Sequence, residues 1–141
     1  QALEIYERLS SSDRLDVQAL ETVATGHLWQ YRVLSALGRL GEAEAALERS
    51  TQLLGKVLEL QKDNVQARRD FAYNALYASV LHERMARQPE VRPRDRAERH
   101  QRAVAEYERG RDLLKVLDAE DRGTAADTQL VQETRVLLKA Q

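Results

Sequence analysis

The stretch DVQALETVA at residues 16–24 returns 48 residues later as NVQARRDFA at residues 64–72, so the chain contains an imperfect internal repeat. Such a period is typical of repeat proteins, in which a unit cannot bury its apolar face alone and stacks on its neighbours. We therefore expect a helical solenoid. Its extended surface would suit contact with other macromolecules better than it would suit enclosing a reaction.

The composition favours helix almost throughout and excludes several classes of protein. The 141 residues include two prolines, six glycines and no cysteine, so we expect one helical domain without disulfides or thiolate metal sites. The net charge of −1 gives the whole molecule no attraction to nucleic acid or to an anionic membrane. No apolar run approaches the roughly 20 residues that cross a bilayer. We expect a soluble, cytoplasmic domain that needs no cofactor.

Apolar residues spaced three and four apart, interrupted by turn-forming residues, predict about six helices. A turn is expected at Ser10–Asp13, where short polar side chains compete with the helix, and a loop at 88–93, which contains two prolines. The expected helices span residues 2–9, 16–37, 42–61, 64–87, 95–118 and 124 onward. They form units at 1–13 (the end of a preceding repeat), 14–63, 64–122 and 123–141 (a terminal helix). The chain is therefore expected to be a fragment of a longer protein.

Small residues recur at one position of the second helix in each unit. Ala2, Ser50 and Gly110 occupy this position, and large residues follow four and seven positions later. These large residues are Tyr6, Leu54 and Leu114 at the first spacing, and Leu9, Val57 and Leu117 at the second. In the first helices, the large residues Val23, Phe71 and Leu130 are followed by Ala24, Ala72 and Val131.

This alternation resembles the tetratricopeptide repeat, a pair of antiparallel helices that cross at small residues. The chain departs from that family in its period, which is 48 residues, whereas the family repeats about every 34 residues. It also has Arg14 and Lys62 where the family has proline, and Leu20 and Arg68 where it has an aromatic residue. The long period resembles bacterial arrays attached to serine/threonine kinases or other signalling domains. The resemblance implies an all-α superhelix of antiparallel helix pairs, with the first helices lining its concave face.

The same resemblance implies that this concave face binds a protein or peptide. The residues expected on it are Gln18, Glu21, Thr25 and Trp29 from the first full unit, Gln66, Arg69, Asp70, Tyr73 and Tyr77 from the second, and Gln132 and Arg135 from the last helix. Exposed aromatic residues beside arginine and glutamine are typical of binding hot spots. The alternative is that the aromatic residues pack between helix layers.

Two further features of the same face bear on its ligand. Trp29 and Tyr77 are equivalent under the 48-residue repeat. Glu21 stands at the position equivalent to Arg69. An acid at this place argues against the family's carboxylate clamp, for which only Arg69 and Asn74 are candidates.

Two other functions stay open beside a non-catalytic interaction scaffold. The domain could be a regulatory or substrate-recruiting segment of a bacterial signalling enzyme. It could also be a nucleic-acid adaptor, because nine arginines lie between residues 84 and 111. Five acids are interleaved with these arginines, which is more typical of a solvated helix face with weak ion pairs, so nucleic acid is the less favoured partner.

We expect no catalytic or metal site. His82 and Glu83 begin the pattern of a zinc-protease helix, but Ala86 stands where the second histidine is needed. His27, His82 and His100 are expected on separate helices. We therefore interpret them as packed or surface residues and expect the protein not to be an enzyme.

The first predicted helix also has an apolar stripe that no preceding layer would cover. Its members are Leu3, Ile5, Tyr6 and Leu9. Terminal repeats normally present a polar outer face. We therefore expect either self-association through this helix or a further repeat packed upon it.

Overall fold

The computed structural model describes residues 2–139, with side chains described from residue 14 onward. This part of the chain consists of five helices and contains no strand, so the prediction of an all-α fold is confirmed. The helices are α1 (Ala2–Ala36), α2 (Leu40–Leu60), α3 (Val65–Ala86), α4 (Pro93–Ala119) and α5 (Ala125–Lys139).

The prediction of about six helices was wrong because α1 is continuous through the expected turn at Ser10–Asp13. Serine and aspartate cost a helix only about 0.5 kcal/mol each relative to alanine, and extending an existing helix is cooperative. Neither glycine nor proline interrupts the sequence before Gly26. The apolar stripe of residues 3–9 and the small residue Ala2 lie outside the residues whose side chains are described.

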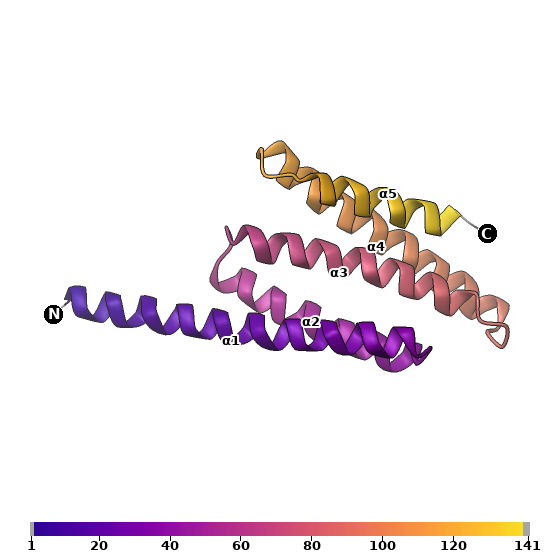
Figure 1. Ribbon diagram of the computed structural model, residues 1–141, viewed down its shortest axis with the longest axis horizontal. Coiled ribbons are helices and arrows are strands. Elements are labelled where there is room, and N and C mark those ends of the chain that lie inside the picture. Colours follow the sequence, from indigo (N-terminus) through magenta and orange to yellow (C-terminus); the bar gives the residue numbers. More distant parts are fainter. Residues whose placement is uncertain (1, 140–141) are drawn as a thin grey trace.

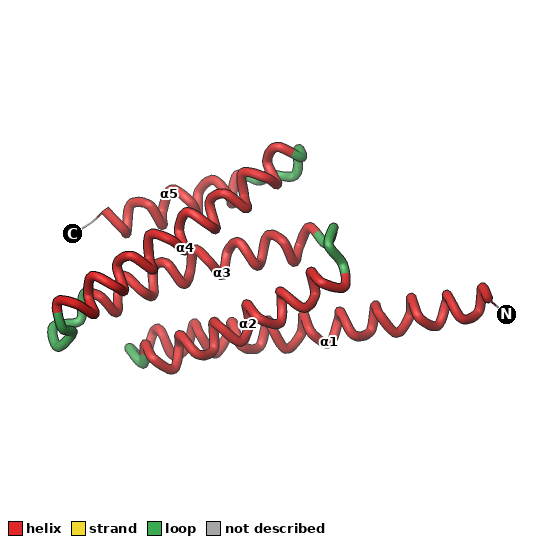
Figure 2. The backbone as a smooth tube through the Cα atoms, turned by 180° about the vertical axis from the view of Figure 1, so that it is seen from behind, coloured by secondary structure: helices red, strands yellow, loops and turns green. Residues whose placement is uncertain are grey.

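The helices form two antiparallel hairpins and a fifth helix packed on the second hairpin. α1 pairs with α2 and α3 pairs with α4, while α2 contacts α3, and α5 contacts both α3 and α4. In Figure 1, α1, α3 and α5 face the viewer, and α2 and α4 lie behind them. Figure 2 shows the reverse side, where α2 and α4 are nearer. We call the side formed by α1, α3 and α5 the first-helix face.

Sequence signals at the helix ends explain where the chain turns. Gly38 has a φ of 78°, a conformation that glycine adopts without a steric penalty. Asn64 caps α3, because its side chain accepts a hydrogen bond from the backbone N–H of Ala67 at 2.9 Å. Pro93 is the first residue of α4, where its missing N–H is not needed. Arg96 braces the preceding loop by donating from Nε to the carbonyl oxygen of Ala86 at 2.9 Å.

The second helices cross the first helices at small residues. A Cβ atom placed on Gly110 of α4 would lie 2.8 Å from Cδ2 of Leu76 and 2.9 Å from the carbonyl oxygen of Ala72. Ser50 of α2 is buried and accepts a hydrogen bond from Asn74 of α3 at 3.0 Å. The large residues that follow on both helices, Leu54, Val57, Leu114 and Leu117, are also buried. Small residues therefore set the spacing of the two layers, as in close helix packing generally.

Candidate functional site

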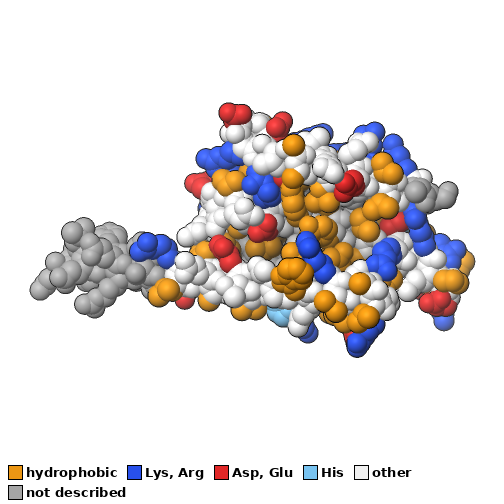
Figure 3. Space-filling model, in the orientation of Figure 1, with side chains coloured by type: hydrophobic (Ala, Val, Ile, Leu, Met, Phe, Trp, Pro, Cys, Tyr) orange, Lys and Arg blue, Asp and Glu red, His pale blue; other side chains and the backbone are white. Residues whose placement is uncertain are grey.

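The first-helix face carries apolar side chains in its middle, with charged side chains on both sides of them. Figure 3 shows this face, on which orange side chains gather over the centre of the helices. Of the residues predicted to bind a partner here, Gln18, Thr25, Trp29, Gln66, Gln132 and Arg135 are exposed, and Glu21, Arg69, Asp70, Tyr73 and Tyr77 are partly buried. Their surroundings divide them into separate groups.

Three tyrosines form a packed cluster between α1 and α3. The rings of Tyr31 and Tyr77 stack with centroids 6.0 Å apart, and Tyr73 meets Tyr77 edge to face at 6.4 Å. Burial raises the pKa of Tyr31 above its usual range, although the nearby charges of Arg84 and Arg32 oppose the rise. Tyr77 therefore contacts rings on both sides, and the cluster joins the first hairpin to the second.

Trp29 lies beside this cluster but is open to solvent. Its side chain is 61% exposed, and the guanidinium carbon of Arg32 lies 5.5 Å from its ring centroid and 5.9 Å from that of Tyr77. These are cation–π distances. Trp29, Arg32 and Tyr77 thus form one continuous surface. Trp29 also borders a groove between α1 and α2.

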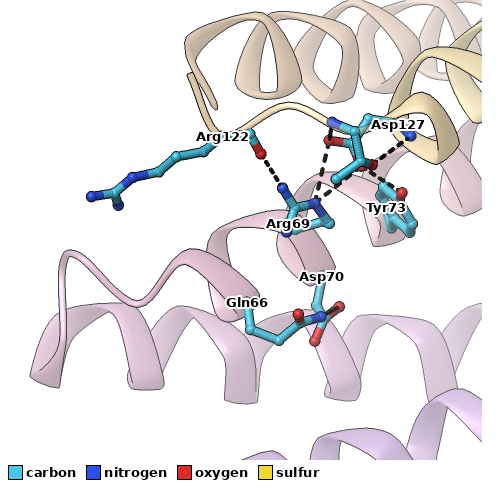
Figure 4. Close-up of polar contacts among 7 residues, drawn as sticks. Gln66, Arg69, Asp70, Tyr73, Arg122 and Asp127 are labelled. Atoms are coloured by element: carbon cyan, nitrogen blue, oxygen red, sulfur yellow. Dashed lines mark hydrogen bonds and ion pairs between the residues drawn. The ribbon is translucent and has the colours of Figure 1, made fainter. Parts of the chain in front are cut away.

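Arg69 is committed to a contact between α3 and α5. Its Nε donates to both carboxylate oxygens of Asp127, at 3.0 and 3.3 Å, and its Nη2 donates to the carbonyl oxygen of Arg122 (Figure 4). Tyr73 donates its hydroxyl proton to the same carboxylate at 2.6 Å. Two residues that the sequence placed in a ligand groove therefore fasten the last helix to the second hairpin.

Asp127 itself belongs to the N-terminal cap of α5. The backbone N–H of Thr124 donates to its Oδ2 at 3.1 Å, and its own backbone N–H donates to Oγ1 of Thr124 at 3.2 Å. This reciprocal pair is a capping box. Burial raises the pKa of Asp127, but hydrogen bonds from Tyr73 and Thr124 together with the charge of Arg69 outweigh burial, so the pKa lies below its usual range. Burial and the bond to Asp127 raise the pKa of Tyr73 to about 12.

Acidic and amide side chains lie around the N-terminal end of α3. Gln66 donates to Oδ1 of Asp70 at 2.8 Å, and Asn64 donates to Oε1 of Glu21 at 3.2 Å. Burial raises the pKa of Asp70 above its usual range, and the negative charge of Glu21 adds to the rise. This end of the face is therefore acidic, although Arg69 lies near it.

Gln132 and Arg135 border a different cavity. They line a groove of about 830 Å³ between α4 and α5, together with apolar residues such as Tyr107, Leu114 and Val131. The structure therefore does not bring all of the predicted residues into one site. The cluster that it does assemble contains Trp29, Tyr73 and Tyr77 from the prediction.

Sequence reasoning missed two groups that shape the site. Arg32 follows Trp29 by three residues, a spacing that places neighbouring side chains together on a helix. Asp127 stands three residues after Thr124, which is the spacing of a capping box with aspartate in place of glutamate. Both spacings are visible in the sequence. The contacts of Arg32 with Tyr77 and of Asp127 with Arg69 join different helices, so the sequence alone does not indicate them.

The arginines between residues 84 and 111 mostly contact the protein itself. Seven of the nine have a carboxylate, hydroxyl or carbonyl partner, and these are Arg84, Arg87, Arg96, Arg99, Arg102, Arg109 and Arg111. Arg109 also lies over the ring of Phe71 at 4.8 Å. All of these except Arg84 and Arg96 pair with a carboxylate, and a guanidinium so paired is a weaker binder of phosphate, so these contacts do not favour a nucleic-acid surface.

The three histidines have polar partners on their own or neighbouring helices. His82 lies 3.0 Å from Nη1 of Arg99, His100 lies 2.8 Å from Oε2 of Glu83, and His27 lies 2.9 Å from Gln30. Burial lowers the pKa of His82 below its usual range. Among the side chains described, no three histidine, aspartate or glutamate residues are grouped closely enough to hold a metal ion.

The helices described are also too short or too polar to span a lipid bilayer.

In comparisons with known proteins, the chain matches no protein-family model, no curated protein and no solved structure. The similarity to the tetratricopeptide repeat therefore stays a prediction from the residues, and function must be argued from the site.

Proposed function

We propose that this chain is a non-catalytic interaction module that binds a segment of a partner protein across its first-helix face. The observation that carries this proposal is the exposed ring of Trp29, next to Arg32 and the tyrosine cluster. An aromatic residue and an arginine beside a packed apolar surface form the usual composition of a binding hot spot.

The arrangement of the helices supports the same proposal. α1, α3 and α5 lie side by side and present one long surface, which suits an extended peptide or a helix better than a small molecule (Figure 1). We further propose that the two hairpins and α5 are successive layers of a tetratricopeptide-like solenoid. The repeat at residues 16–24 and 64–72 supports this, because the two copies fall on α1 and α3.

The polar groups on the face can supply what a bound segment requires. Gln18 and Thr25 on α1 and Gln66 on α3 are exposed. The side chains of Gln18 and Thr25 are available to pair with the backbone of an extended peptide, and Gln66, whose amide nitrogen donates to Asp70, keeps its amide oxygen as an acceptor, while Trp29 provides the apolar anchor. Arg69 and Tyr73 play a different part, since they hold α5 in place and so preserve the shape of the surface.

The proposal can be tested with Trp29, which is the only tryptophan of the chain and so reports from the site without a label. Linear peptides are selected from a random library on the immobilised protein and titrated against it in solution. A segment that covers Trp29 shifts its emission to the blue. Trp29→Ala is expected to weaken binding at least about tenfold, measured by anisotropy of a labelled peptide, as for a hot-spot residue.

Val116→Ala is the matched control, because Val116 is an exposed apolar residue on α4, away from the first-helix face. It should leave the affinity unchanged, and circular dichroism should show both variants to be as helical as the parent protein. The proposal would be contradicted if the library yielded no binding peptide, or if the selected peptides bound Trp29→Ala as tightly as the parent.

A further inference from the structure

The first-helix face is electrically polarised along its length. Asp70 and Asp127 lie in the first two turns of α3 and α5, and Glu21 of α1 lies beside Asn64, the N-cap of α3. By contrast, residues 22–36 of α1 and 71–82 of α3 contain no acid at all. Arg32 and Arg84 lie at this other end, where both of their charges act on the hydroxyl of Tyr31. Attraction for an anion is therefore concentrated around the Tyr31–Tyr77 stack.

Neither arginine pairs with a carboxylate among the side chains that the structure describes. Arg84 donates to the hydroxyl of Ser35 at 2.5 Å and to the carbonyl oxygen of the same residue at 3.2 Å. Both partners are neutral groups, so neither of them neutralises the charge of Arg84. The adjacent acid, Glu83, is buried and bonds to Arg87 and His100 instead.

Arg32 lies over two aromatic rings. Its guanidinium carbon is 5.5 Å from the ring centroid of Trp29 and 5.9 Å from that of Tyr77. A cation–π contact places no carboxylate on the guanidinium, so its N–H groups can still donate to one. A carboxylate can accept two of these in parallel, which is the strong bidentate geometry.

Apolar surface continues on both sides of the two arginines. Trp29 and Val33 are more than half exposed on α1. On α5, Leu137 is 48% exposed, and its carbonyl oxygen accepts a hydrogen bond from Arg87 at 3.0 Å. Exposed apolar side chains are therefore present on α1 and on α5 for a partner's peptide to contact.

We propose that Arg32 and Arg84 recognise the side-chain carboxylate of an aspartate or glutamate within a partner's peptide, and that a large apolar residue of the same peptide packs on Trp29. This inference rests on the proposed function, which supplies the peptide and the face. It adds the chemistry of the peptide and the place of its charge. Complementarity with the surface around these two arginines selects an acidic segment over a basic one.

The test starts from a library of random peptides with amidated C-termini, selected on the parent protein. Enriched peptides should contain aspartate or glutamate close to a large apolar residue. Replacing that acid by its amide should weaken binding by about tenfold or more, as expected for a lost charge-assisted hydrogen bond. Arg32→Gln should weaken the parent peptide by a similar factor and leave the amide peptide unaffected, so the two changes are not additive.

Arg94→Gln provides the matched control, since it removes the same charge from an exposed position on α4. An equal loss of affinity in this variant would show general charge attraction and overturn the inference. Arg32→Lys, which keeps the charge without the planar fork, should bind less tightly than the parent.

Three further outcomes overturn the inference and separate it from the proposed function. Peptides that depend on Trp29 but show no preference for acids refute the carboxylate site and leave the proposed function standing. Peptides that are enriched only from a matching library with free C-terminal carboxylates refute a side chain as the source of the anion. If no selected peptide depends on Trp29, the proposed function fails and the inference fails with it.

Discussion

Glu21 of α1 and Arg69 of α3 occupy equivalent positions of the repeat and have opposite charges, yet each contacts the N-terminal cap of the next helix on the same face. Glu21 accepts a hydrogen bond at 3.2 Å from Asn64, the N-cap of α3. Arg69 donates at 3.0 Å to Asp127, in the capping box of α5. The charge difference between the two copies is therefore matched by a difference in the caps that they contact.

This relationship leads to a prediction for Arg69→Ala. The substitution removes the donors to Asp127 and Arg122, and leaves a buried carboxylate with fewer partners. We expect the free energy of unfolding to fall by about 1–3 kcal/mol, as for a lost hydrogen bond to a charged group. Urea denaturation followed by circular dichroism measures this change.

The neighbouring Arg68 provides a control with the same side chain. It pairs with Glu120 through two hydrogen bonds at 2.6 and 3.0 Å, but at the protein surface. Exposed ion pairs contribute about 0–1 kcal/mol, so Arg68→Ala should cost less than Arg69→Ala. Equal losses for the two variants would show that the contact with Asp127 is no stronger than a surface pair.

The lowered pKa of Asp127 predicts how stability depends on pH. Its ordinary value is 3.8 and its folded value is lower, so the carboxylate stabilises the fold above about pH 4 and loses this effect as pH falls through the folded pKa. Asp127→Asn should therefore be less stable than the parent at pH 7. The difference should shrink in urea titrations below pH 4, and a difference that stayed constant down to pH 2 would contradict the assignment.

The overall fold was largely predictable because its signals are local. The periodic apolar residues, the prolines of the 88–93 loop and the cap at Asn64 each act within a few residues, and the structure has helix boundaries close to those expected. The break at Ser10–Asp13 was wrong for a related reason. Short polar residues weaken a helix only slightly, and in that segment neither glycine nor proline is present to end it.

The site was less predictable, because its contacts join helices that are far apart in sequence. The repeat indicated that Arg69 lies on the first-helix face, but the position of α5 decided that its donors meet Asp127, 58 residues later. The contact of Arg32 with the ring of Tyr77 depends in the same way on how α1 lies beside α3. Pattern analysis finds which face a residue occupies, and tertiary packing decides what it touches there.

Asp70 should show the opposite dependence on pH to Asp127. Burial raises its folded pKa above the ordinary 3.8, so the ionised carboxylate destabilises the fold at neutral pH. Asp70→Asn keeps an oxygen that can accept from Gln66 and should raise the unfolding free energy at pH 7 by up to about 1 kcal/mol. The gain should vanish below pH 3.8, where the Asp70 carboxyl of the parent is protonated in both the folded and the unfolded state.

Asp63→Asn serves as the comparison for Asp70, because Asp63 is an exposed acid in the turn before α3. Its effect on unfolding in urea should stay within about 0.5 kcal/mol at all of these pH values. If Asp70→Asn proved destabilising at pH 7, ionised Asp70 would have to take part in a favourable interaction that outweighs its burial.

Two helical glycines should respond in opposite directions to alanine. At Gly110 the new Cβ would lie 2.8 Å from Cδ2 of Leu76 and 2.9 Å from the carbonyl oxygen of Ala72, a backbone atom that cannot turn aside. Forcing α3 and α4 apart costs about 1–3 kcal/mol, which exceeds the helix-propensity gain of about 1 kcal/mol. At Gly55 of α2 the nearest atom is Cε2 of Phe71 at 3.9 Å, so alanine there keeps that gain. Thermal unfolding should show a lower Tm for Gly110→Ala and a higher Tm for Gly55→Ala. A stabilised Gly110→Ala would mean that α3 and α4 do not cross closely at this residue.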